Sequence, residues 1–111
     1  MMRIDTNDVN ITLRDTPTNW GSGVCLYSGD LFTGIMYEYF PTTNQLCSEV
    51  ELKEGILDGR QVEYWPNGKL KIEYFEKYDT IYGAFKKWDE QGILISHVEY
   101  DNNGNLIKKI I

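Results

Sequence analysis

The chain has few residues of the kinds on which metal, redox and membrane proteins depend. It contains two cysteines, Cys25 and Cys47, and one histidine, His97, in 111 residues. Two isolated cysteines do not have the spacing of a zinc site, and we expect them to be small buried residues rather than a disulfide. Apolar runs such as Ile93–Ile95 end after three or four residues, whereas a membrane-spanning helix needs about 20. We therefore expect no metal site, no cofactor and no membrane span.

Basic charge is also scarce. The chain has 11 Lys and Arg residues against 17 Asp and Glu residues, which gives a net charge of −6. Nucleic acids and anionic membranes attract clustered Lys and Arg, so we expect neither as a partner, and a basic protein fits better. The N-terminus, Met1–Asp5, lacks the basic stretch and apolar core of a secretory signal. The expected location is the cytoplasm, and the length fits one domain.

One pattern recurs along the chain: an aromatic residue, three residues, Gly, one residue, and Leu. It occurs in Tyr64–Leu70, Trp88–Leu94 and Tyr100–Leu106, and with one extra residue in Tyr39–Leu46. In the last of these Asn44 takes the place of Gly, and Asn adopts positive φ more readily than other residues. The chain is therefore an internal repeat, the kind of sequence that forms stacked units.

A second glycine stands five residues before three of the aromatic residues, at Gly34, Gly59 and Gly83, with spacings of 25 and 24 residues. A period near 24 divides into two strand-plus-turn units, which suits antiparallel hairpins. Apolar and charged residues alternate in Leu70–Tyr74 as in a strand with one buried face, and Asn67-Gly68 favours a tight turn. The predicted fold class is all-β: a single elongated antiparallel sheet of tandem β-hairpin repeats.

The two ends of the chain differ from the repeats. Residues 1–23 are predicted to be an N-terminal cap segment on the repeat domain of residues 24–111, because a repeat stack exposes its end unless something covers it. Within the cap, Val9–Leu13 is predicted to be a strand, and Asp15–Asn19 and Gly21–Gly23 to be loops. Leu106–Ile111 is predicted to be a last strand, whose two lysines blunt an exposed edge.

Residues Gly59 to Tyr74, centred on Glu63–Leu70, resemble the MORN-repeat variant found in bacterial proteins, and the resemblance spans about Leu26 to Leu106. It implies an elongated antiparallel sheet of successive hairpins. Many bacterial members of that family are antitoxin or immunity components that neutralise a co-encoded toxin, and the family has no shared catalytic residues.

No residue pattern indicates catalysis. His97 has no evident partners for acid–base or metal chemistry, so it is expected on a sheet surface. The many carboxylates alternate with core residues, which is typical of a solvated strand face rather than of a glycosidase pair. Nothing near Cys25 or Cys47 supports a nucleophile–base pair with His97. We expect a protein that is not an enzyme.

Alternation divides the central hairpin into two faces. One face is predicted to hold Val62, Tyr64, Leu70, Ile72 and Tyr74, and the other Glu63, Trp65, Lys71, Glu73 and Phe75. Aromatic residues and Met on a charged face are typical of a protein-binding patch. The predicted protein-binding residues are Met36, Glu38, Phe40, Glu63, Trp65, Glu73 and Phe75. The alternative is that the N-terminal segment folds over this face and buries Trp65 and Phe75 in a second small core.

These patterns lead to a functional hypothesis and a rival. The hypothesis is a cytoplasmic immunity or antitoxin protein that occludes a basic toxin domain. Glu38, Glu63 and Glu73 would steer the encounter, while Phe40, Trp65 and Phe75 would supply desolvated contacts. The rival is a structural module that self-assembles or docks beside a membrane. The identity of the partner and the oligomeric state stay open.

Overall fold

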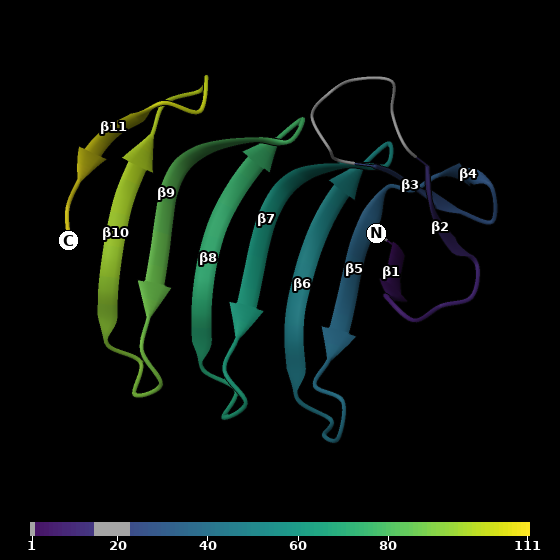
Figure 1. Cartoon of the computed structure of the whole chain (residues 1–111), viewed down its shortest axis with the longest axis horizontal. Helices are drawn as coiled ribbons and strands as arrows, with labels where there is room; N and C mark the ends of the chain where they lie inside the picture. The colour runs from purple at the N-terminus through teal and green to yellow at the C-terminus, as the bar shows by residue number, and fades with distance from the viewer. Residues whose placement is uncertain (1, 15–22) are drawn as a thin grey trace.

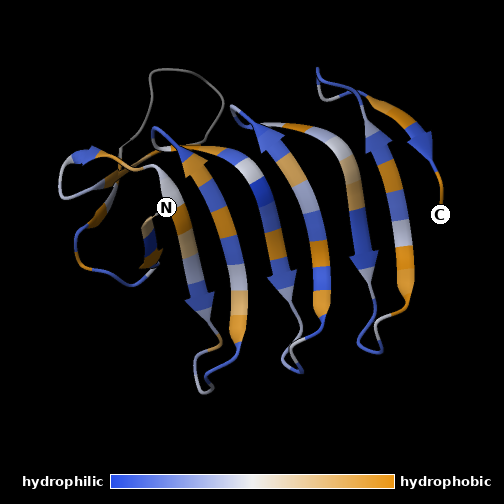
Figure 2. Ribbon diagram, turned by 180° about the vertical axis from the view of Figure 1, so that it is seen from behind, coloured by the Kyte–Doolittle hydropathy of each residue, from blue (hydrophilic) through white to orange (hydrophobic). Residues whose placement is uncertain are grey.

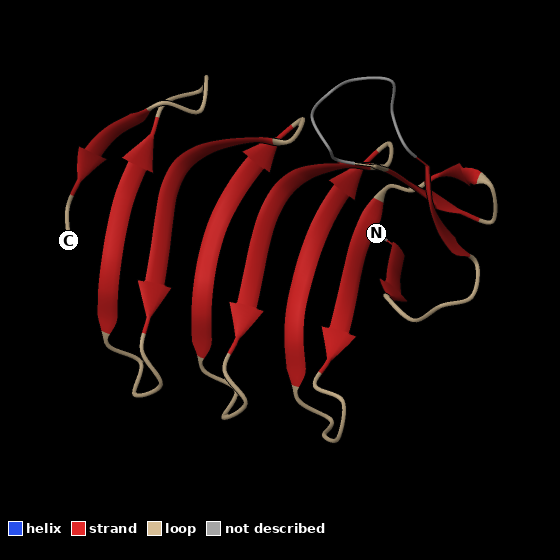
Figure 3. Ribbon diagram, in the orientation of Figure 1, coloured by secondary structure: helices blue, strands red, loops and turns tan. Residues whose placement is uncertain are grey.

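The computed structural model describes residues 2–14 and 23–111, which form strands and turns (Figures 1 and 3). No helix in these ranges is long and apolar enough to cross a membrane. The strands are β1 (Met2–Asp5), β2 (Ile11–Arg14), β3 (Val24–Tyr27), β4 (Asp30–Leu31), β5 (Gly34–Tyr39), β6 (Leu46–Lys53), β7 (Ile56–Tyr64), β8 (Leu70–Lys77), β9 (Thr80–Trp88), β10 (Leu94–Tyr100) and β11 (Leu106–Lys109).

Eight strands form one sheet in the order β1-β5-β6-β7-β8-β9-β10-β11. From β5 to β11 each strand is antiparallel to the one before it, and β1 lies parallel to β5 at one edge (Figure 1). Hydrophobic and hydrophilic residues alternate along these strands (Figure 2), as a pleated strand requires. The predicted all-β sheet of tandem hairpins is confirmed.

The Asn-Gly signal marks real hairpin turns. In the turn after β7 the Trp65 amide donates to the Lys69 carbonyl at 2.8 Å, and the Gly68 amide donates back to the Trp65 carbonyl at 2.9 Å. Gly68 has φ of 89°, a value that side-chain-bearing residues rarely adopt. The turns at 40–45, 65–69 and 89–93 connect the strands at one end of the hairpins, which we call the turn edge, whereas the turn at 101–105 lies at the opposite end (Figure 1).

Gly59, in β7, lies at a β-bulge that interrupts the pairing of β6 with β7. The register shifts between Val50 and Leu52, and β7 bends at this end (Figure 1). The Glu51 carboxylate accepts a hydrogen bond from the Arg60 amide at 3.1 Å. A Cβ on Gly59 would lie 2.2 Å from Glu51 Oε1, and the backbone φ of Gly59 is 113°. This contact accounts for the glycine at position 59. At Gly83, five residues before Trp88, an added Cβ would meet nothing within 4 Å, and there the positive φ of 70° is what favours glycine.

The two faces of the sheet differ from the predicted division. Residues directly opposite each other share a face, and Val62 pairs with Glu73 while Glu63 pairs with Ile72. The prediction that Val62 and Ile72 lie together is therefore wrong. The register shifts by one residue between Glu63 and Tyr64, and such a shift moves every following side chain of the partner strand to the other face.

We name each face after a central residue. The Gln61 face carries the row Met36, Val50, Gln61, Tyr74, Phe85 and Val98, and the Val62 face carries the row Tyr37, Glu49, Val62, Glu73, Lys86 and His97. On the Gln61 face the ring of Tyr74 stacks on that of Phe85, with centroids 4.8 Å apart. Aromatic residues of successive hairpins thus pack against each other along the sheet.

The N-terminal residues cap one end of the Gln61 face. β2, β3 and β4 form a small sheet, and the buried core joins Ile4, Cys25, Phe32 and Leu52. Met36, Val50 and Leu57 of the large sheet pack against this core. The predicted boundary after residue 23 lies between β2 and β3 of the same small sheet. The predicted loop Asp15–Asn19, and Gly21-Ser22 of the other, lie outside the described residues.

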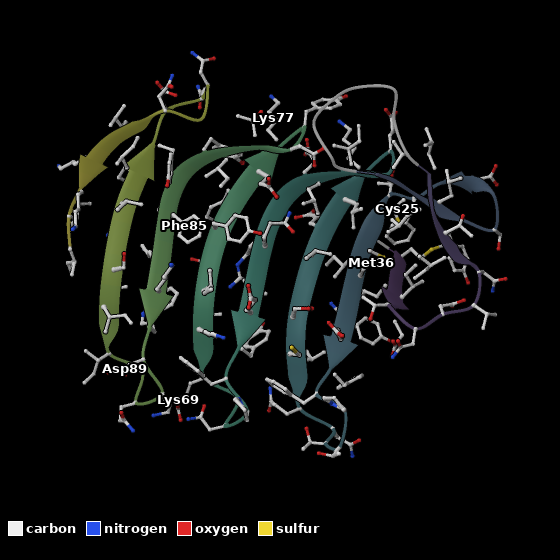
Figure 4. The ribbon with its side chains drawn as sticks, in the orientation of Figure 1. Cys25, Met36, Lys69, Lys77, Phe85 and Asp89 are labelled. Atoms are coloured by element: carbon white, nitrogen blue, oxygen red, sulfur yellow. The ribbon has the colours of Figure 1, made fainter. Side chains whose placement is uncertain are left out.

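The cap covers the part of the sheet around Met36, and not the part around Trp65 and Phe75 that the sequence suggested. Cys25 Sγ lies 3.7 Å from Met36 Sδ (Figure 4), so Met36 packs beneath the cap. Phe75 lies on the Val62 face, where its ring packs against that of Tyr82 at 6.1 Å. Over the described ranges Trp65 and Phe75 are half-buried and neither belongs to the capped core.

Candidate functional site

The structure does not bring the seven predicted binding residues together. Met36, Glu38 and Glu63 lie on the Gln61 face, and Met36 is packed under the cap. Glu73 and Phe75 lie on the Val62 face. Phe40 and Trp65 lie in turns along one edge of the sheet.

Charges on the Val62 face are paired between strands, either neighbouring ones (β7 and β8) or strands with one other between them (β1 and β6). The Arg60 guanidinium contacts the Glu73 carboxylate at 2.7 Å, and Arg3 pairs with Glu49. The hydroxyl of Tyr64 also donates to Glu49, at 3.0 Å. Burial raises the pKa of Glu49, but the hydrogen bonds from Arg3 and Tyr64 outweigh it, so this pKa lies below its ordinary value. This face therefore presents carboxylates that are already satisfied within the chain.

Trp65 joins neighbouring repeats at the turn edge. Its indole nitrogen donates to the Trp88 carbonyl at 3.1 Å, and the Lys71 ammonium lies 4.7 Å from its ring centroid. Nearby, Asn67 donates to the Glu90 carbonyl at 2.8 Å and Lys69 to the Gln91 carbonyl at 3.1 Å. Lys69 and Asp89 lie on this edge in Figure 4. Trp65 thus has a structural role in linking the turn at 65–69 to the turn at 89–93.

The Gln61 face contains a pocket between two glutamates. Glu38 pairs with Ser48, and Ser48 pairs with Glu63, so the three residues lie in one row across β5, β6 and β7. Adjacent strands are about 4.8 Å apart, which places the two glutamate backbones about 10 Å apart. The small side chain of Ser48 leaves space between the longer ones. The resulting pocket has a volume of about 250 Å³, and its lining includes Glu38, Ser48, Val50, Gln61, Glu63 and Tyr74.

The electrostatics of this pocket are acidic. Burial raises the pKa of the Cys47 thiol at its rim, and the carboxylates of Glu38 and Glu63 raise it further against an opposing effect of Lys71. Burial, Glu76 and Glu63 likewise raise the pKa of Tyr74. The three ion pairs formed among the described residues involve neither Glu38 nor Glu63. The pKa values of Cys47 and Tyr74 are therefore both raised in part by carboxylates, and two of these, Glu38 and Glu63, form no ion pair with a described cation.

Gln61 supplies an unused acceptor at the same pocket. The residue is 1% exposed, and its side-chain amide nitrogen donates to the carbonyls of Glu51 at 3.0 Å and Gly59 at 3.3 Å. Only the nitrogen can donate to carbonyls, so the orientation of the amide is determined. Its Oε1 atom is buried and accepts no hydrogen bond from the part of the chain that the structure describes. Buried polar atoms are normally hydrogen-bonded, so this one is an exception that requires an explanation.

The second repeat lacks this pocket. The same row continues from Glu63 to Ile72, Lys87 and Ser96. Ile72 takes the position equivalent to Ser48, and Lys87 takes the position equivalent to Glu63. The ammonium of Lys87 lies 5.6 Å from the centroid of the Phe85 ring. In the first repeat the row has two acids with the small Ser48 between them. In the second repeat the row has an acid and a base, Glu63 and Lys87, with the larger Ile72 between them.

Sequence reasoning found Glu38 and Glu63 but missed Ser48, Gln61 and Tyr74. The alternation rule placed Tyr74 on the wrong face relative to Glu63, because the one-residue bulge at the turn is not evident in the sequence. Ser48 could have been found by comparison with Ile72, its equivalent 24 residues later.

Metal chemistry finds no support in the geometry. Within residues 2–14 and 23–111, no three His, Cys, Asp or Glu side chains are grouped so that they could hold a metal ion. His97 lies in β10, with Nε2 3.6 Å from Glu99 Oε1, and is half-buried in the sheet.

Comparison with known proteins supports the repeat assignment. Residues 57–76 and 81–102 match the model of the MORN repeat variant family. The first stretch contains most of β7 and β8, and the second most of β9 and β10, so each is one hairpin. Such repeats make a protein-binding or structural module. Searches of curated proteins and of solved structures found no match.

Proposed function

We propose that this chain is a non-catalytic, cytoplasmic protein-binding module of the bacterial immunity or antitoxin type, which neutralises a basic toxin domain by occluding it. The observation that supports this is the pair of carboxylates, Glu38 and Glu63, on one face of the sheet without a described salt-bridge partner. A net charge of −6 favours encounter with a basic surface. The resemblance to antitoxin-type repeat proteins supplies the class of partner.

The Gln61 face is the side that we propose to contact the partner. On the Val62 face Glu73 is held by Arg60, so most of its charge is already balanced. Glu38 and Glu63 remain for steering, and the adjacent turns carry Phe40 and Trp65 within two residues of these glutamates. Association that is steered by carboxylates slows with added salt, because charges more than about 8–10 Å apart are largely screened at physiological ionic strength. A salt-independent association rate would remove Glu38 and Glu63 from the mechanism.

A pull-down from lysate of the native host tests the proposal. The baits are the wild-type protein, the double variant Glu38→Gln/Glu63→Gln, and the control Glu54→Gln/Glu90→Gln, which removes the same charge from two exposed turns. We expect the wild type and the control to recover one basic protein whose toxic activity is lost when the wild type is added in equal amount. Equal recovery by the pocket variant, or recovery of an acidic protein, would contradict it.

One feature supports a structural module as a second candidate. Six of the twelve exposed large hydrophobic residues among those described lie at the C-terminal edge: Ile93, Ile95, Leu106, Ile107, Ile110 and Ile111. Exposed apolar residues beside an open strand edge favour self-assembly. Sedimentation of the purified chain distinguishes the candidates, since a concentration-dependent oligomer favours the structural module and a monomer favours the immunity role.

A further inference from the structure

We propose that the pocket on the Gln61 face receives a single arginine side chain, whose guanidinium lies between Glu38 and Glu63 and donates to Gln61 Oε1. The arginine belongs to the partner protein, so this inference rests on the proposed function and specifies what the partner presents.

The row across β5, β6 and β7 has the spacing for such a group. Glu38 and Glu63 stand on opposite sides of Ser48, with backbones about 10 Å apart. A guanidinium is planar and carries five N–H donors in a rigid fork, so it can meet acceptors on two sides at once. The carboxylates provide acceptors at either side of the gap, and the pocket of about 250 Å³ has room for the end of the side chain.

Gln61 provides an acceptor at the inner wall of the pocket. Its amide nitrogen is held by the carbonyls of Glu51 and Gly59 at the bulge, so its Oε1 atom, bonded to the same carbon, is the atom of the amide that these two carbonyls leave unbonded. In the row of the Gln61 face, both neighbours of Gln61, Val50 and Tyr74, line the pocket. A donor from outside the described chain would satisfy this buried atom.

Tyr74 adds an aromatic wall. Its ring is fixed by stacking on Phe85 at 4.8 Å. The chain pairs cations with aromatic rings elsewhere, since Arg3 lies 5.2 Å from the Tyr37 centroid and Lys71 lies 4.7 Å from that of Trp65. Arginine is preferred over lysine here, because its fork matches separated acceptors and it is more weakly hydrated than an ammonium.

The second repeat is an internal comparison for this inference. Its equivalent row has Lys87 where the first has Glu63, and Ile72 where the first has Ser48. The chain thus closes and neutralises the row in the second repeat and leaves it open and acidic in the first. The position that needs a cation from outside is therefore confined to the first repeat.

A titration of the full chain with end-blocked arginine, N-acetyl-arginine-methylamide, tests the inference by ¹H–¹⁵N NMR. We expect saturable shifts centred on the amides of Ser48 and Glu63 and on the side-chain amide of Gln61. The citrulline analogue has nearly the same shape without the charge, and it should bind at least tenfold more weakly. Equal binding of the two, or shifts centred elsewhere, would overturn the inference.

Two variants test the location. Ser48→Ile places in the pocket the residue that its equivalent position already holds, and we expect it to abolish arginine binding. Ser48→Ala keeps the space and should bind within twofold of the wild type. Glu38→Gln/Glu63→Gln should weaken binding at least tenfold, while Glu54→Gln/Glu90→Gln should not. Retention of binding by Ser48→Ile with a native spectrum would refute the pocket as the site.

The same variants separate this inference from the proposed function. Binding of the arginine compound without capture of a basic protein would support the pocket and contradict the immunity role. Capture of a basic toxin that binds wild type and Ser48→Ile equally would support the immunity role and refute the arginine pocket.

Discussion

The turn between β8 and β9 has a backbone conformation that its residues disfavour. Tyr78 and Asp79 have φ of 49° and 62°, the positive values of a type I′ turn, for which Asn-Gly is the preferred pair. The comparable turns at Ser28-Gly29 and Glu54-Gly55 have Gly in second place. An L-residue in the left-handed region costs roughly 1–2 kcal/mol, although Asp tolerates it better than most. Replacing Asp79 by Gly therefore relieves strain at this turn.

The gain can be estimated from two opposing effects. Relief of the left-handed conformation contributes about 1–2 kcal/mol, and the extra freedom of Gly in the unfolded chain subtracts about 0.5–1 kcal/mol. The backbone bond from the Asp79 amide to the Leu57 carbonyl, 3.1 Å long, is kept. We expect Asp79→Gly to raise the free energy of unfolding by up to about 1.5 kcal/mol, equivalent to up to about 9 °C in melting temperature for a domain of this size.

A charge effect must be separated from the conformational one. Glu76 is buried, and burial and the nearby Asp79 both raise its pKa, so removing the Asp79 carboxylate also relieves repulsion at neutral pH. Asp79→Asn removes that charge and keeps a side chain at a position with positive φ, which Asn tolerates at least as well as Asp. Urea unfolding of the wild type and both variants at pH 7 measures the two effects. If Asp79→Gly is no more stable than Asp79→Asn, the turn stores no strain and the reasoning fails.

Three further predictions concern single positions. Gly59→Ala should destabilise the fold by about 2–3 kcal/mol, well above Gly92→Ala, because both have positive φ but only at Gly59 does the added Cβ meet the Glu51 carboxylate; urea unfolding compares them. Glu76→Gln should stabilise the fold at pH 7, because the raised pKa of Glu76 means that its ionisation disfavours folding. The gain should vanish in melting curves as pH falls below the ordinary value of 4.5, and a gain that persists there would contradict the assignment. Trp65→Ala should lower stability by about 2 kcal/mol through loss of packing and of the bond to Trp88, and an unchanged melting temperature with weakened partner binding would instead make Trp65 an interface anchor.

The fold was predictable from the sequence because its signals are local. Asn67-Gly68 and the alternation in Leu70–Tyr74 depend on turn and pleat geometry within one hairpin, and the structure confirms the turn and the strand. The single buried face is not found, because Leu70–Phe75 are all half-buried. The identity of the face was not predictable. A strand has a side-chain period of two, so the single-residue bulge between Glu63 and Tyr64 exchanges the faces of β8 relative to β7. The same uncertainty does not arise within one strand, which is why Glu73 and Phe75 were grouped correctly with each other.

The pocket depends on contacts that are distant in sequence, and this explains why only its acids were found. Glu38, Ser48 and Glu63 meet because three strands pair in one register, and neither the register of β5 with β6 nor that of β6 with β7 is specified by a turn motif alone. Nothing in the sequence marks Gln61 as a buried residue, because a polar residue in a strand is normally expected to face solvent. Its burial follows from the bulge at Gly59, which directs its amide nitrogen to two backbone carbonyls.

The cap packs against the part of the sheet that also carries the pocket, and this bears on where recognition takes place. Val50 packs against the buried core of Ile4, Cys25, Phe32 and Leu52 and also lines the pocket. This part of the pocket wall therefore packs against the buried core, whereas all six residues from Leu106 to Ile111 are exposed. A rigid wall reduces the entropy lost when a partner side chain is ordered, which favours affinity at the pocket over the C-terminal edge. Enlarging the core space by Phe32→Leu should thus weaken arginine binding even though Phe32 does not line the pocket.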